Sequence, residues 1–129
     1  MIEYSFSYRK LNVYQSSKVL VKEIYRIANL FPRNELYALG DQMRRAVVSI
    51  PSNIAEGMGR NSIKERIHFM EIANGSLSET MCQLEIAHLL GYISDDELAS
   101  SETNMAEMSR LLSGLKKSLE EKVKSKNNY

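Results

Sequence analysis

Apolar side chains recur every three or four residues along four separate stretches of this 129-residue chain. That spacing places them on one face of an α-helix. Around residues 12–31, for example, Val13, Leu20 and Ile24 share one face, whereas Lys18 lies on another. The pattern predicts an all-α protein with four amphipathic helices.

Turn and capping residues separate these stretches. Pro32 marks the end of the first helix, and Gly57 supplies the backbone freedom that ends the second. Residues 62–65 and 94–97 have the form of capping boxes, which open the third and fourth helices. Short turns between long helices favour a single domain, residues 1–129, folded as an antiparallel up-down-up-down four-helix bundle. The expected helices cover about residues 12–31, 35–57, 62–91 and 95–124.

The first eleven residues follow a different period. Ile2, Tyr4, Phe6 and Tyr8 alternate with polar neighbours, which is typical of extended chain. Residues 1–11 are therefore expected to form an extended N-terminal arm, which must lie on its own bundle or on a neighbouring copy because one isolated strand is unstable.

Cysteine content and hydropathy indicate the cellular compartment of the protein. One cysteine, Cys82, excludes an intramolecular disulfide and fits a reducing compartment, and its place in an apolar region predicts a buried, inert thiol. The chain has neither a signal-peptide pattern nor about 18 consecutive apolar residues, so we expect a cytoplasmic protein without membrane contact.

The sequence contains two Glu-x-x-His segments, the pattern that binds metal in four-helix carboxylate proteins. They begin at Glu65 and Glu85 on the same expected helix, so about 30 Å separates them. A two-metal site needs them on facing helices. We therefore expect no metal and no cofactor, and the absence of a nucleophile or acid–base constellation predicts that the protein is not an enzyme.

The net charge of +1 hides an uneven distribution. Residues 1–70 hold 11 Lys+Arg against 6 Asp+Glu, whereas residues 71–129 hold 6 against 10. Either the two halves attract each other within or between subunits, or the first half presents a basic face to an anion.

The second expected helix carries a proline and a line of polar residues. Pro51 predicts a kink near residues 47–51, because proline removes one backbone donor and clashes with the preceding turn. Polar residues beside the apolar face form a ribbon that would be half-buried and would fix helix packing or subunit register. They are Gln42, Arg45, Ser49, Ser52, Asn53 and Glu56, with Asn74, Ser78 and Glu79 as partners on the third helix.

Basic residues surround the start of the third helix. Arg60 directly precedes it and Lys64 and Arg66 follow, where free backbone N–H groups and the helix dipole favour negative charge. Arg44 and Arg45 could add to this field. The five cations are candidates for contact with a nucleic-acid backbone.

Several blocks of the sequence resemble one family. They are Phe31-Pro32, Arg45-Ala46, Ser49-Ile50-Pro51-Ser52-Asn53-Ile54-Ala55-Glu56-Gly57 and Gly75-Ser76 followed by Glu79. Over about residues 10–120 the chain is similar to the bacterial four helix bundle proteins, also called 23S rRNA-intervening-sequence proteins.

This resemblance implies a four-helix bundle that assembles into a ring of five copies and has no established enzymatic activity. Members are encoded within sequences that interrupt 23S rRNA genes. A related branch, the accessory protein of diversity-generating retroelements, is thought to bind nucleic acid and reverse transcriptase.

Two functions follow as expectations. The first is a non-enzymatic homo-oligomer whose basic half contacts the RNA or DNA backbone. The alternative is a structural or protein-interaction scaffold that binds a protein partner without nucleic acid.

Overall fold

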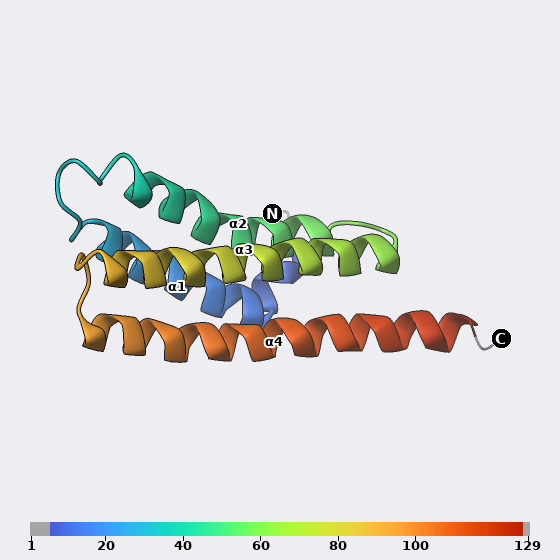
Figure 1. Cartoon of the computed structure of the whole chain (residues 1–129). Coiled ribbons are helices and arrows are strands. Elements are labelled where there is room, and N and C mark those ends of the chain that lie inside the picture. The colour runs from blue at the N-terminus through green and yellow to red at the C-terminus, as the bar shows by residue number, and fades with distance from the viewer. Residues whose placement is uncertain (1–5, 128–129) are drawn as a thin grey trace.

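Four α-helices make up almost all of the protein in a computed structural model, which describes residues 6–127 and side chains up to Ser125 (Figure 1). Each helix packs antiparallel against the next, and α1 also packs against α4, which closes the bundle. The described residues contain no strand. The predicted all-α, up-down-up-down four-helix bundle is thereby confirmed. The helices are α1 (Asn12–Ala28), α2 (Leu39–Met58), α3 (Ile63–Leu89) and α4 (Asp95–Asn127).

The apolar faces of the helices meet in one core. Among its fully enclosed side chains are Ile24, Met43, Ile50, Leu84 and Leu119, so all four helices contribute. No helix in the described part of the chain combines the length and the apolarity that crossing a membrane requires. Three apolar residues that widen the stripe of α3 are not covered: Ile72, Ile86 and Leu89 are exposed. This bundle alone therefore does not bury the whole apolar surface of α3.

Three helix boundaries differ from the sequence prediction by three residues or more: α4 runs to Asn127 instead of about 124, and the other two lie between α1 and α2. The first helix ends at Ala28, and the second begins at Leu39 instead of residue 35. Between them the chain forms turns, in which Pro32 and Glu35 carbonyls accept backbone hydrogen bonds. The Glu35 carboxylate also accepts a hydrogen bond from the Leu39 N–H. Glu35 therefore belongs to the connection and not to α2, and the connection is longer than expected.

A short segment precedes α1, as expected, but only Phe6 and Leu11 of its described part are extended. Ser7–Lys10 form one turn of 3₁₀-helix, η1, which packs on α1 and α2. The Tyr8 ring meets the Tyr14 ring edge-on, with centroids 4.8 Å apart. Ile2 and Tyr4, on which the extended arm was also predicted, lie outside the described residues.

Helix α2 continues through Pro51 without a break. In Figure 1 its first half slopes towards α3 and its second half runs alongside α3, which agrees with a bend near the proline. The second half approaches α3 very closely. A Cβ added at Gly57 would lie 2.5 Å from the Cβ of Phe69 and 2.9 Å from the Cε of Met70. Only glycine fits at this crossing.

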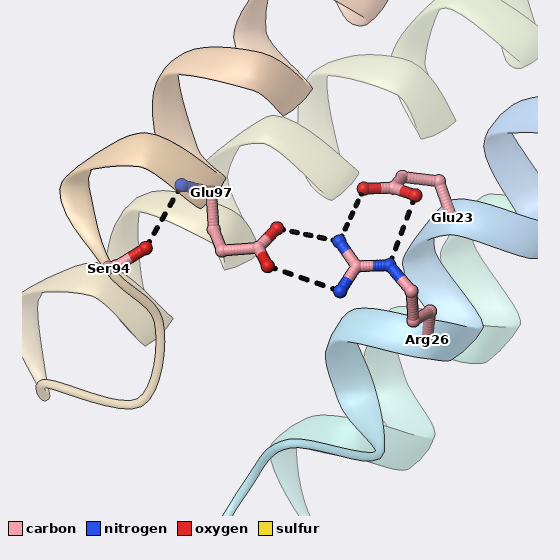
Figure 2. A network of polar contacts seen from close by, with 4 residues as sticks. All are labelled: Glu23, Arg26, Ser94 and Glu97. Carbon is pink, nitrogen blue, oxygen red and sulfur yellow. Dashed lines mark hydrogen bonds and ion pairs between the residues drawn. The ribbon is translucent and has the colours of Figure 1, made fainter.

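An ion-pair cluster joins α1 to α4 (Figure 2). Arg26 donates two hydrogen bonds to the Glu97 carboxylate, at 2.7 and 3.1 Å, and two to Glu23, at 2.7 and 3.3 Å. The Glu97 N–H binds the Ser94 hydroxyl at 3.1 Å, which is half of the predicted capping box. The Glu97 carboxylate does not return to Ser94 but reaches α1. The hydrogen bonds from Arg26 hold the pKa of Glu97 below its ordinary value of 4.5, although partial burial opposes the shift.

Gly57→Ala should destabilise the protein by about 1 to 3 kcal/mol, because the new methyl group forces α2 and α3 apart. Gly75→Ala is the matched control: Gly75 lies inside α3 with open space around its Cα, so alanine should stabilise the helix by about 0.5 to 1 kcal/mol. Urea unfolding of both variants measures the difference. Equal effects would contradict the close crossing.

Arg26→Met should lower the thermal midpoint at pH 7 more than at pH 3. Because the pKa of Glu97 is depressed in the folded state, the stabilisation is present above its ordinary value of 4.5 and is lost as pH falls through the folded pKa. The difference in midpoint between wild type and variant should therefore shrink on acidification. A difference that is independent of pH would show that Arg26 acts through packing alone.

Candidate functional site

Ser49 is the centre of the polar ribbon on α2. Its hydroxyl oxygen lies 2.8 Å from the Ser76 hydroxyl of α3 and accepts a hydrogen bond from the Asn53 amide at 2.9 Å. The same amide nitrogen is 2.7 Å from the Ser49 carbonyl. Since Ser49 accepts from Asn53, its own proton is free to go to Ser76. On α3, Thr80 donates to the Ser76 carbonyl at 2.8 Å. These residues form a polar lock between two helices that are otherwise held by apolar packing.

The rest of the ribbon does not reach α3. Gln42, Ser52 and Glu56 are exposed, and Glu56 pairs with Arg60. The predicted partners on the third helix were wrong. Ser76 faces α2, while Asn74 and Ser78 line a groove shared with α4. Glu79 is exposed and makes no hydrogen bond to a described residue. Residues two positions apart on a helix differ by about 200° in direction, which separates Ser76 from both Asn74 and Ser78.

Arg44 has a structural role. Its guanidinium donates to the Leu36 carbonyl at 2.9 Å, to Asp41 at 3.0 Å and to the Asn29 side chain at 3.2 Å. It also lies over the Tyr25 ring. These contacts join the end of α1, the connection and the start of α2. Arg44, predicted as a nucleic-acid contact, is therefore already engaged within the chain.

The structure separates the five predicted cations into two groups. Arg44 and Arg45 lie near the start of α2, about 24 Å along the helix from Arg60 at its end. Arg60, Lys64 and Arg66 lie together around the α2–α3 turn, where the Arg66 Nε donates to the Arg60 carbonyl at 2.7 Å. Arg60 itself pairs with Glu56 at 2.9 Å and covers the Phe69 ring. Arg44 and Arg45, which were candidates to add to the field around Arg60, therefore form a separate group.

Sequence reasoning missed two cations beside the second group. The Lys116–Glu71 contact, 3.6 Å, fixes how α4 runs against α3. Because the helices are antiparallel, this register sets Lys122 and Lys124 at about the same level along the bundle as Lys64. The sequence signal for them is the run of lysines in residues 116–126. We call this surface the basic end of the bundle. It comprises Arg60, Lys64, Arg66, Lys122 and Lys124.

The remaining reactive side chains are dispersed. Cys82 is exposed, which corrects the prediction of a buried thiol: it lies on the outer face of α3, three residues from Glu79. Glu65 and Glu85 lie on the single helix α3, and His88 pairs with Asp95 at 2.5 Å across the α3–α4 turn. No group of three or more His, Cys, Asp or Glu side chains within residues 6–125 is placed to hold a metal ion.

Ser49→Ala should destabilise the protein by about 1 to 2 kcal/mol, because it leaves the buried Ser76 hydroxyl without its partner, whereas Asn53 keeps its bond to the carbonyl of residue 49. Ser52→Ala is the matched control, since Ser52 is exposed on the same helix and has no partner among the described residues. Adding Ser76→Ala to Ser49→Ala should cost less than the sum of the two single changes. Additive losses, measured by urea unfolding, would contradict the lock.

Comparisons with known proteins identify the family. A family model described as 23S rRNA-intervening sequence protein matches residues 9–114. A solved structure from Bacteroides thetaiotaomicron, described as a protein with unknown function from the S23 ribosomal protein family, aligns with a TM-score of 0.75 at 24% identity. The alignment covers 81% of this chain and 98% of that chain, and it supports the fold. No curated protein matches significantly. Because the family model covers most of the sequence, this chain belongs to the 23S rRNA-intervening sequence protein family.

Proposed function

We propose that the protein is a non-enzymatic, self-associating bundle that binds the sugar–phosphate backbone of RNA or DNA at its basic end. The observation that carries the proposal is that two cationic segments distant in the sequence lie at the same end of the bundle (Figure 1). Residues 60–66 and 116–126 together hold eight Lys+Arg against three Asp+Glu. Such a concentration of positive charge attracts phosphates without reading bases.

The cations of the basic end are available to a ligand. Lys64, Lys122 and Lys124 are exposed and form no ion pair with another described residue. Arg60 pairs with Glu56, but both side chains are exposed: 43% of the Arg60 surface and 55% of the Glu56 surface are accessible to solvent. Exposed pairs contribute little, about 0 to 1 kcal/mol, so phosphate can displace Glu56 from Arg60. A cytoplasmic setting, where nucleic acid is abundant, fits this role.

Self-association is part of the proposal. The family resemblance implies a closed ring of five copies. Exposed apolar side chains on α1, α2 and α3, namely Val19, Val48, Ile72 and Ile86, supply surface that a neighbouring copy would cover. A ring would also bring several basic ends together and so raise the effective affinity for a long nucleic acid.

The rival function is a scaffold that binds a protein partner and no nucleic acid. It is favoured by the engagement of Arg44, Arg60 and Arg66 within the chain. Purified oligomer that lacks nucleic-acid affinity and retains a co-purifying protein would support it.

The double variant Lys64→Glu/Lys124→Glu should bind labelled single-stranded RNA and duplex DNA at least about tenfold more weakly than wild type in fluorescence anisotropy, because two phosphate contacts become repulsive. The slope of log affinity against log salt should also fall in magnitude by about one for each phosphate that the variant no longer neutralises.

Arg33→Glu/Arg110→Glu is the matched control for this test, because it makes the same change in net charge at exposed positions away from the basic end. It should bind nearly as well as wild type. Equal losses of affinity in both variants would show a diffuse charge effect. Binding by wild type that does not respond to salt would overturn the proposal.

A further inference from the structure

A groove between α3 and α4 is acidic at its edges and apolar at its floor. Leu77, Met81 and Met105 form the floor, with Glu85 on the α3 wall and Glu102 on the α4 wall. The chain around the groove is also negatively charged: residues 71–109 contain eight Asp+Glu and no Lys or Arg. An occupant of this acidic groove needs apolar surface flanked by positive charge.

A second groove, between α1 and α2, has the complementary character. Two adjoining hollows share Val48 and Ser52, and their apolar lining includes Val21 and Pro51. Lys18 on α1 and Arg45 on α2 supply one cation on each wall, whereas Asp41 and Arg44, which also line the groove, pair with each other at 3.0 Å. Both cations are exposed, and Arg45 has no partner among the described residues. We call this the basic groove.

The charge difference between the two halves is not neutralised within one chain. Among the described residues, one ion pair, Arg26–Glu97, joins the first 70 residues to the rest. The carboxylates of the acidic groove and the cations of the basic groove therefore remain for an outside partner. A second copy of the chain supplies both complementary surfaces at once.

We infer that the basic groove of one copy packs against the acidic groove of the next. Because the helices follow one another around the bundle, the α1/α2 surface and the α3/α4 surface lie on opposite sides of it. Each copy thus uses one surface of each kind, which gives a head-to-tail interface that forms a ring when its rotation closes. This inference rests on the self-association proposed above and assigns its two surfaces.

Charge reversal tests the interface through sedimentation of the purified full chain. Glu85→Lys/Glu102→Lys and Lys18→Glu/Arg45→Glu should each raise the dissociation constant of the assembly by at least about tenfold, because like charges then face each other. All four residues are exposed, so circular dichroism should report an unchanged fold. The variant that combines all four changes should reassemble, since both surfaces have exchanged sign.

Glu79→Lys/Glu120→Lys is the matched control, with the same change of net charge on α3 and α4 outside the groove. It should assemble as wild type does. If wild type assembles but neither groove variant weakens it, or the combined variant fails to recover, the surface assignment is overturned and self-association stands. A monomeric wild type at every concentration overturns both. Neither result bears on the proposal that the basic end binds nucleic acid, because the anisotropy experiment tests that proposal separately.

The same variants separate other occupants of the grooves. Loss of RNA binding without loss of assembly in Lys18→Glu/Arg45→Glu would assign the basic groove to nucleic acid and overturn the inference. If Glu85→Lys/Glu102→Lys still assembles but loses a co-purifying basic protein, the acidic groove binds that protein, and the inference is likewise overturned.

Discussion

The distance between α2 and α3 determines much of this structure. Gly57 allows the backbone of α2 to contact the side chains of Phe69 and Met70, and Ser49 meets Ser76 at a hydrogen-bonding distance two turns earlier. Small residues at both points let the helices approach closely over the second half of α2. The bend near Pro51 brings that half into line with α3. The position of the α2–α3 turn, and with it the basic end, follows from this contact.

Helix periodicity and capping residues were sufficient to predict the fold. The faces containing Ile24, Met43, Leu84 and Met108 are buried as expected, because apolar residues recur at helical spacing in each helix. The start of α2 was predicted four residues too early, because apolar periodicity alone does not distinguish the turns at residues 33–38 from a helix. The exposure of Cys82 was missed for a similar reason. The apolar stripe of α3 is broader than the surface that its neighbours cover.

The candidate site was predictable only in part. Charge counts located the cations but not their partners, so Arg44 and Arg60 were assigned to a ligand although each has carboxylate and aromatic contacts within the chain. Conversely, Lys122 and Lys124 join the basic end through helix register, which depends on how α4 pairs with α3. Ser49 was predicted as part of a packing network. Its partner, Ser76, could not be predicted, because the sequence does not show which side of α3 faces α2.

The Arg26–Glu97 cluster has a consequence for the order in which the bundle forms. Every other interface between the four α-helices joins neighbours in the sequence, so each helical hairpin can assemble soon after its two helices leave the ribosome. Arg26 and Glu97 are 71 residues apart, and their contact must wait for α4. We expect α1 to remain the loosest helix until synthesis nears completion, which pulsed amide exchange on stalled chains would detect. Helix α4, which is synthesised last, thus supplies the contact that holds α1 in the bundle.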